Sequence, residues 1–148
     1  MWLALQNVSR QGNAFDGFDY QHWIESALAE IARTPLETTV RIVDEDEMRE
    51  LNSQFRGKRT PTNVLSFPFE TIDGIDYQYL GDVVLCAPTV KLEAFEQGKS
   101  LDSHCAHLII HGTLHLCGYD HVTEQEAIAM ESLEKTIMDG LGFADPYV

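Results

Sequence analysis

Apolar residues recur along the chain with two periods, and these periods predict the elements of the fold. Four short segments rich in apolar and β-branched residues predict strands, at 2–8, 38–43, 63–67 and 82–86. Five longer segments predict helices, at 20–33, 45–55, 89–97, 100–117 and 124–139. Segment 71–77 carries Gly74 and two aspartates, and it predicts a loop or a hairpin turn.

Polar residues at the starts of these segments predict helix caps. Asp19 precedes the first helical segment and is a preferred N-cap residue. Asp44 is followed three residues later by Glu47, which is the spacing of a capping box. Thr123 and Glu126 have the same spacing at the start of the last helical segment. We therefore expect side-chain caps at all three helix starts.

The order of the segments predicts an α+β fold. Strands come first and mostly alternate with helices, and three helices close the chain. We therefore expect a mixed β-sheet packed against the long helix 100–117 and further helices. At 148 residues and 16.7 kDa, with 44% hydrophobic and 23% charged residues, residues 1–148 fit one globular domain.

The apolar and cysteine patterns predict a cytoplasmic protein. No stretch approaches the roughly 18–20 apolar residues that a membrane helix needs. The start of the chain has a short apolar run without a preceding positive charge, so we interpret it as a strand rather than a secretory signal. Cys86, Cys105 and Cys117 form no C-x-x-C pair, which is typical of reduced cytosolic thiols.

The charge balance excludes one mode of nucleic-acid binding. Ten Lys and Arg residues stand against 24 Asp and Glu residues, which gives a formal net charge of −14. Phosphate contacts need Lys and Arg, so overall charge cannot hold this chain on a nucleic acid. A local basic site is still available, because Arg56, Lys58 and Arg59 fall within four positions.

The strongest chemical signal is a cluster of histidines. His111 and His115 are four residues apart, so on a helix they share a face and can bind one metal ion. Gly118 allows the chain to leave the helix in a left-handed turn, which can bring His121 back to the same ion. Three imidazoles suit zinc and leave a fourth position for water, which is the arrangement of a catalytic site.

Other side chains near this cluster are weaker candidates. His107 lies one turn before His111 and competes with it as a ligand, although the Gly118 turn favours the downstream set. A structural site needs a fourth protein ligand, and Cys117 is the nearest, but it faces away from the ion if the helix continues. His22, His104 and His107 are otherwise interpreted as solvated or hydrogen-bonded histidines.

The ligand spacing equals that of the metzincin metalloproteases, H-E-x-x-H-x-x-G-x-x-H. Where those enzymes carry the glutamate general base, this chain has Gly112. A peptidase without that base loses its proton shuttle. The spacing therefore predicts the metal geometry without the peptidase chemistry.

The histidine segment resembles the signature of the YbeY family of bacterial, zinc-dependent endoribonucleases. Further blocks are similar to the same family, namely LNSQFRGK at 51–58, PTNVLSFP at 61–68, GDV at 81–83 and DPY at 145–147. Together the blocks span about residues 40–147. Arg59 departs from the pattern, since family members often carry an acidic residue after Gly-Lys.

The resemblance implies both a fold and an activity. It implies a zincin-like mixed sheet with the metal helix against it, and single-strand-specific RNA cleavage. It further implies maturation of the 3′ end of 16S ribosomal RNA and ribosome quality control, with a small-subunit ribosomal protein or an assembly GTPase as partner. By position it implies one zinc ion per chain held by His111, His115 and His121, and Arg56 as the functionally important arginine.

The chemistry of phosphodiester cleavage suggests roles for the basic cluster. Zinc lowers the pKa of bound water to about 7 and polarises a phosphoryl oxygen. A guanidinium can donate two hydrogen bonds to the charged equatorial oxygens, so we expect Arg56 to stabilise the transition state across a cleft from the metal. Lys58 and Arg59 would hold the flanking phosphates. Asp82 and Asp120 are both candidates for the general base, unless the 2′-hydroxyl of RNA is the attacking group.

Two alternatives remain open at this point. One is a zinc hydrolase of another class, such as a peptidase with a different base. The other is a non-catalytic ribosome-assembly factor whose metal only holds the fold. Asp120 also has an alternative role, because it adjoins His121 and can hydrogen-bond a ligand imidazole.

Overall fold

The computed structural model describes residues 1–34, 37–58, 60–69 and 78–148. Within these residues the elements follow one another as β1 (Trp2–Asn7), the 3₁₀ helix η1 (Gly12–Phe15), α1 (Tyr20–Glu30), β2 (Glu37–Val43), α2 (Glu45–Arg56), β3 (Val64–Pro68), β4 (Tyr79–Cys86), α3 (Ala87–Glu96), α4 (Leu101–Leu116) and α5 (Glu124–Gly140). No described helix has the length and apolar character needed to cross a membrane.

The strands form one mixed sheet in the order β1-β2-β4-β3. β1, β2 and β4 are parallel, whereas β3 runs antiparallel to β4 and lies at one edge. β2 and β4 are the central strands, and their β-branched residues suit positions that are covered on both faces. The mixed sheet predicted from the order of the segments is confirmed.

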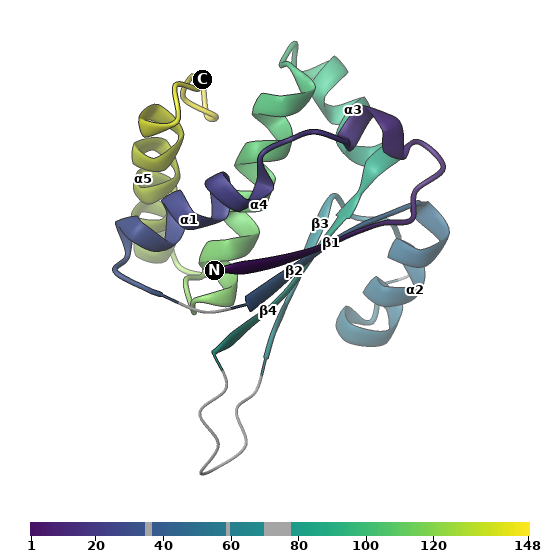
Figure 1. The fold of residues 1–148 in the computed structure, drawn as a ribbon, viewed down its shortest axis with the longest axis horizontal. Coiled ribbons are helices and arrows are strands. Elements are labelled where there is room, and N and C mark those ends of the chain that lie inside the picture. Colours follow the sequence, from purple (N-terminus) through teal and green to yellow (C-terminus); the bar gives the residue numbers. More distant parts are fainter. Residues whose placement is uncertain (35–36, 59, 70–77) are drawn as a thin grey trace.

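Helices cover both faces of the sheet (Figure 1). α1, α3, α4 and α5 lie over one face and enclose the main core, whereas α2 lies over the other face above a smaller cluster. α4 contacts β3 and β4 on one side and α1, α3 and α5 on the others. This enclosed position explains why α4 is the most apolar of the predicted helical segments, and it confirms the packing of the long helix on the sheet.

The four predicted strands and five predicted helices are present, with boundaries that shift by a few residues. The largest shifts are at the end of α1, which stops at Glu30, and at the start of β4, which begins at Tyr79 because its first residues already pair with β2 and β3. Segment 12–15 forms a 3₁₀ helix that the periodicity did not predict. The loop predicted at 71–77 lies outside the described residues.

Two of the three expected caps are confirmed. The Asp19 carboxylate accepts a hydrogen bond from the backbone N–H of His22, and the Thr123–Glu126 capping box forms in full. The box expected at Asp44 is wrong, because that side chain makes no cap bond. Asp44 instead accepts hydrogen bonds from Ser9, 2.6 Å to its hydroxyl, and from Arg10. Partners on the strand-end loop thus replace the local donor.

The three thiols are free and lie in or against the hydrophobic core. Cys86 and Cys105 are fully buried, and Cys117 is half-buried against the main core. Burial raises the pKa of all three, that of Cys105 to about 12. These side chains therefore behave as small apolar groups.

Candidate metal centre and substrate cleft

The exposed edge of α4 is made of histidines. From residue 104 to residue 116, every side chain on this helix is buried except those of His107, His111 and His115. Their spacing of four places them in one row on the helix surface. His104 lies outside this row and is buried, with its Nε2 3.0 Å from a carboxylate oxygen of Glu93. The helix thus presents imidazoles at the one surface that neighbouring elements leave accessible.

A glycine turn brings a further imidazole to this row. The backbone N–H of Gly118 donates to the carbonyl of His115, and Gly118 has a φ of 95°. That region favours glycine, because a Cβ atom would clash with the backbone there. The chain then reverses and places His121 beside the helix. One nitrogen from each of His111, His115 and His121 lies within 4.8 Å of the others, so the three can hold one metal ion.

The hydrogen bonds of the first two ligands set which nitrogen is available. Nδ1 of His111 lies 3.0 Å from a carboxylate oxygen of Glu134, and Nδ1 of His115 lies 2.9 Å from the carbonyl oxygen of Tyr119. Both partners are acceptors, so each Nδ1 carries the proton and each neutral ring has its lone pair on Nε2.

The two Nε2 atoms, of His111 and His115, face each other at 3.0 Å. Two facing lone pairs repel unless a cation or a proton lies between them. Burial lowers the pKa of His115, and the neighbouring His111 and His121 lower it further, so this ring favours its neutral form. Neutral imidazoles with converging lone pairs are the donor set of a transition-metal site, which the residues present therefore fit.

A buried carboxylate supports this site from behind. The side chain of Glu134 on α5 is 1% exposed and accepts hydrogen bonds from His107, from His111 and from the hydroxyl of Tyr147 at 2.7 Å. Burial alone raises the pKa of Glu134, but these hydrogen bonds together outweigh it and lower the pKa to about 2. His107 therefore hydrogen-bonds to Glu134 and is not one of the three candidate metal ligands.

In front of the histidines lies a cleft of about 520 Å³. One side is formed by His111, His115 and His121, which we call the histidine wall. The other side is formed by Arg56 and by β3 residues with the segment just before them, which we call the arginine wall. Its lining residues are Arg56, Thr62, Asn63, Val64, Leu65, Ser66 and Pro68.

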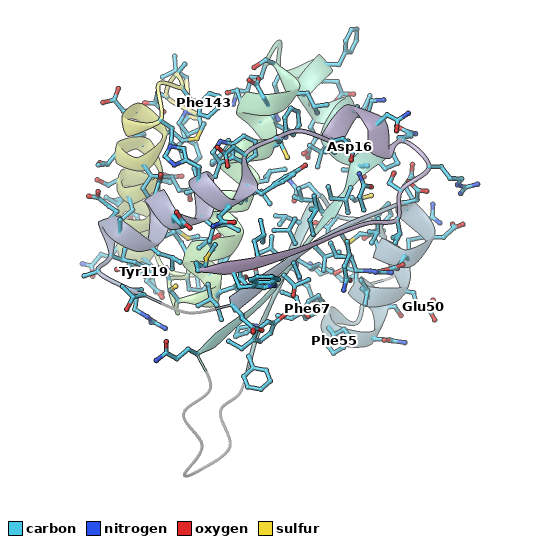
Figure 2. All side chains as sticks on the ribbon, viewed as in Figure 1. Asp16, Glu50, Phe55, Phe67, Tyr119 and Phe143 are labelled. Carbon is cyan, nitrogen blue, oxygen red and sulfur yellow. The ribbon has the colours of Figure 1, made fainter. Side chains whose placement is uncertain are left out.

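Local structure positions Arg56 on this wall. It is the last residue of α2, and Gly57 ends the helix with a φ of 69°. The ring of Phe55 packs edge-on against that of Phe67 on β3, with ring centres 4.8 Å apart, and both labels lie close together in Figure 2. This contact fixes the end of α2 beside the edge strand. The exposed guanidinium of Arg56 consequently lines the cleft.

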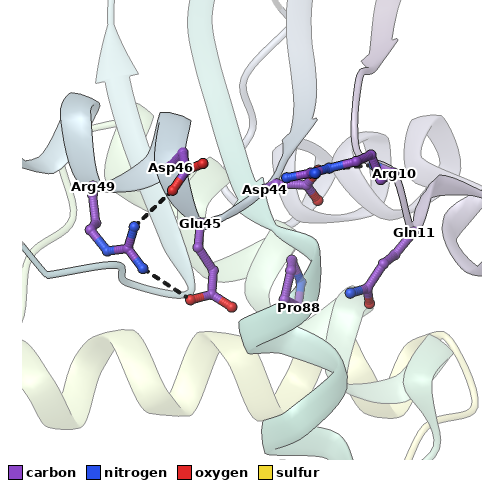
Figure 3. Close-up of a pocket in the computed structure, with 7 residues that line it drawn as sticks. All are labelled: Arg10, Gln11, Asp44, Glu45, Asp46, Arg49 and Pro88. Atoms are coloured by element: carbon purple, nitrogen blue, oxygen red, sulfur yellow. Dashed lines mark hydrogen bonds and ion pairs between the residues drawn. The ribbon is translucent and has the colours of Figure 1, made fainter.

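Arg56 differs from three other arginines by having no partner among the described residues. The others are held in ion pairs, namely Arg10 with Asp44, Arg41 with Glu47, and Arg49 with Glu45 and Asp46. Figure 3 shows two of these arginines around a hollow of about 280 Å³ at the start of α2, where their charges are already neutralised. The cleft guanidinium therefore keeps its hydrogen-bond donors available for an anion.

Position 112, where metzincins carry their glutamate base, has no room for a side chain in this structure. A Cβ atom on Gly112 would lie 2.8 Å from Val83 and 3.0 Å from Ser66, and the Ser66 hydroxyl donates to the Gly112 carbonyl at 2.9 Å. Gly112 thus faces the sheet rather than the cleft, because α4 approaches β3 and β4 closely here. A glutamate at this position would collide with the sheet.

The remaining predicted residues fall in different places. Asp120 lines the cleft, and its carboxylate accepts a hydrogen bond from the backbone N–H of His121 at 2.8 Å rather than from a described imidazole. Asp82 accepts a hydrogen bond from the Tyr79 hydroxyl and lies two residues before Val84 on β4. It therefore shares the face of the sheet that α2 covers, opposite α4. Lys58 is exposed beyond the end of α2, and Arg59 lies outside the described residues.

Sequence reasoning missed Glu134 and Tyr147 as parts of the site. A signal for Glu134 was available, since it shares one stripe of helix α5 with the buried Met130, Ile137 and Met138. A carboxylate on an apolar stripe is rarely buried without a partner. Tyr147 had no comparable local signal, because its role depends on how the chain folds back after α5.

A mixed sheet, a helix with paired histidines and a third imidazole from the next turn together define a candidate metal-dependent hydrolase. Comparisons identify the family within this class. A family model described as Endoribonuclease YbeY matches residues 5–142. The Endoribonuclease YbeY of Colwellia psychrerythraea is 50% identical over 132 residues, which is 87% of this chain and 85% of that protein. The chain therefore belongs to the YbeY endoribonuclease family, as its motifs indicated.

A solved structure supports the same fold. The solution structure of TM1509 from Thermotoga maritima matches with a TM-score of 0.57 and 26% sequence identity, over 98% of each chain. The match extends over the helices as well as the sheet. It confirms the α+β architecture predicted for the chain.

Proposed function

We propose that this chain is a single-strand-specific, zinc-dependent endoribonuclease of one domain that acts in the cytoplasm on the 3′ end of 16S ribosomal RNA and in ribosome quality control. The observation that carries the proposal is the cleft itself, which is lined both by three converging imidazoles and by an arginine that has no partner among the described residues. Family membership supports RNA as the substrate. A metal ion held by the imidazoles would act as a Lewis acid on a scissile phosphate, and Arg56 would donate hydrogen bonds to its oxygens.

Each wall has a separate role in this proposal. His111, His115 and His121 would hold one zinc ion, which when bound supplies Lewis acidity and water of lowered pKa. Arg56 donates hydrogen bonds to the equatorial oxygens as negative charge develops on them. Asp120 is the candidate base that the geometry retains, because it lines the cleft whereas Asp82 lies across the sheet. Lys58 and Arg59 are proposed to hold flanking phosphates.

The net charge of −14 shapes how the substrate is reached. Few phosphates can be neutralised by this chain, so naked RNA should bind weakly and lose affinity as salt rises. Recruitment by a small-subunit ribosomal protein or an assembly GTPase would supply the missing affinity. Filter binding of the isolated chain to a single-stranded ribosomal RNA fragment checks this expectation. Tight binding that is insensitive to salt would contradict it.

The test of the proposed activity combines metal content with cleavage. The full chain is purified without a histidine tag, its metal is measured by elemental analysis, and it is incubated with matched single-stranded and duplex ribosomal RNA fragments. The variants are His111→Ala and Arg56→Ala. We expect one zinc per chain, cleavage of the single strand alone, and two inactive variants of which only His111→Ala loses metal.

Several outcomes would contradict the proposal. One zinc per chain with cleavage unchanged in both variants would indicate a contaminating nuclease and favour a non-catalytic assembly factor. Cleavage of proteins that is lost on chelation and restored by zinc would favour a peptidase, although Gly112 leaves no room for the usual base. Unchanged cleavage in Arg56→Ala alone would remove this residue from the mechanism.

A further inference from the structure

The least expected feature of the site is the buried carboxylate of Glu134. It comes from a different helix than the two histidines of α4, and its side chain is 1% exposed. A carboxylate removed from water in this way is strongly destabilising unless hydrogen bonds replace its hydration. Three donors replace it here, from His107, His111 and Tyr147. The three hydrogen bonds therefore hold a carboxylate at a buried position where an unpartnered one would be strongly destabilising.

The two carboxylate oxygens of Glu134 have different partners, and this difference indicates the role of the side chain. Oε1 lies 3.0 Å from Nδ1 of His111, whereas Oε2 accepts from His107 and from the Tyr147 hydroxyl. Two donors thus anchor one oxygen and leave the other aimed at the ligand. We propose that Glu134 is a positioning residue that holds His111 in its metal-binding orientation, and that Tyr147 and His107 fix this carboxylate in turn; the inference rests on the proposed function.

The three candidate ligands differ in the hydrogen bonds that their rings make, so the inference applies to His111 in particular. His111 is supported by a carboxylate, and His115 by the backbone carbonyl of Tyr119. The ring of His121 makes no hydrogen bond with the described residues and is exposed. An ionised partner fixes the tautomer of an imidazole and makes its other nitrogen a stronger donor to a metal. Glu134 therefore acts on metal affinity through His111.

Tyr147 brings the final segment of the described chain into the site. Its hydroxyl donates to Oε2 of Glu134 at 2.7 Å, and its backbone N–H donates to the Asp145 carboxylate at 2.8 Å. The ammonium group of Lys99 donates to the carbonyl of the buried Pro146 at 2.5 Å. These bonds dock the DPY block beside α5. The block, which had no role in the proposed cleavage, thereby gains one in building the metal centre.

The experiment measures zinc affinity of the full chain without RNA, by competition with a chromogenic zinc chelator. Glu134→Gln keeps the size of the side chain but has only one acceptor oxygen for three donors, and we expect zinc to bind about 10–100-fold more weakly. Tyr147→Phe removes one hydroxyl and should weaken zinc binding about two- to tenfold, the range of one hydrogen bond. The matched control is Asp139→Asn, an exposed position on the same helix, which should bind zinc unchanged.

Circular dichroism and thermal melts of the metal-free proteins identify variants that fail to fold. If Glu134→Gln is unfolded, Tyr147→Phe decides the question. Folded variants with the zinc affinity of the parent chain would overturn the inference, and so would a parent chain that binds no zinc. A parent chain that binds zinc in a Glu134-dependent manner but cleaves no RNA would support the inference and contradict the proposed function, so the two failures are distinguishable.

Discussion

The two walls of the cleft are built in opposite ways. On the histidine wall, His111 and His115 are partly buried, and each has its Nδ1 engaged by a fixed acceptor. On the arginine wall, Arg56 is exposed and has no partner among the described residues. Two imidazoles of the histidine wall are therefore oriented by contacts within the protein, whereas the guanidinium of Arg56 keeps its donors available for an anion.

This difference follows from what each wall has to bind. A metal ion requires several ligands at fixed distances, and errors in their placement reduce affinity directly. A flexible RNA strand presents its phosphates in many geometries, so a long side chain that is free to adjust can meet them. The comparison leads to four tests, ordered from the largest expected effect to the smallest.

Removing the metal should abolish RNA cleavage, which depends on the histidine wall, and should leave RNA binding by the arginine wall in place. We expect a chelator to reduce RNA cleavage to background and to lower the Tm, because a metal bound only by the folded state stabilises that state. Binding of single-stranded RNA should change little, since Arg56 is unaffected. Adding zinc back should restore cleavage. Equal loss of cleavage and of RNA binding would mean that the two walls do not act separately.

Arg56→Ala should lower kcat by about 10²–10³-fold, the effect of removing one donor from a developing oxyanion. Arg56→Lys should fall between the parent and the alanine variant, because an ammonium lacks the planar fork of a guanidinium. The matched control is Arg49→Ala on the same helix, whose side chain is occupied by Glu45 and Asp46. Single-turnover cleavage at saturating RNA separates kcat from binding. A loss confined to KM would mean that Arg56 only binds RNA.

Gly112→Ala should destabilise the protein by about 1–3 kcal/mol, because the new methyl group would overpack the contact between α4 and the sheet. The matched control is Gly140→Ala, where a Cβ atom meets nothing within 4 Å. That change should be neutral or stabilising by about 0.5–1 kcal/mol. Urea unfolding of the two variants checks both values. Equal stability would show that α4 can move away from β3 and β4.

Glu93 links the arginine wall to helix α4 and should make the stability of the chain slightly sensitive to acid. Its carboxylate accepts hydrogen bonds from Asn63 of the arginine wall, at 3.1 Å, and from His104 of α4, at 3.0 Å. Burial raises the pKa of Glu93, but these bonds outweigh it and lower the pKa below its usual 4.5. A lowered folded-state pKa stabilises the fold above the unfolded-state value, and this stabilisation is lost as pH falls through the folded-state pKa.

We therefore expect Glu93→Gln to be less stable than the parent by roughly 1 kcal/mol at pH 7, with the gap closing below pH 4.5. Glu96→Gln, an exposed position on the same helix, is the control. Urea unfolding across this pH range measures the gap. A gap that stayed constant from pH 7 to pH 3 would show that ionisation of Glu93 contributes nothing.

The sequence predicted features that depend on nearby residues and missed those that depend on packing. His111, His115 and His121 were identifiable because one helix and one glycine turn bring them together. The link between Glu134 and His111 depends on the angle at which α5 crosses α4, which spacing does not encode. Asp44 shows the same limit, since its expected local bond is replaced by Ser9 and Arg10. Arg56 was singled out through the family motif and expected across a cleft from the metal, and in the fold it lines the same cleft as the three histidines.

The three cysteines lie outside the set of candidate metal ligands, and this affects how the site responds to oxidants. The three candidate ligands are imidazoles, and all three thiols are buried or half-buried, with pKa values raised by burial. Oxidants attack thiolates far more readily than thiols, and many zinc sites release their metal when a cysteine ligand is oxidised. A centre of nitrogen and carboxylate groups offers such oxidants no target. A metal ion held by these imidazoles would therefore not be released by oxidation of a thiolate ligand.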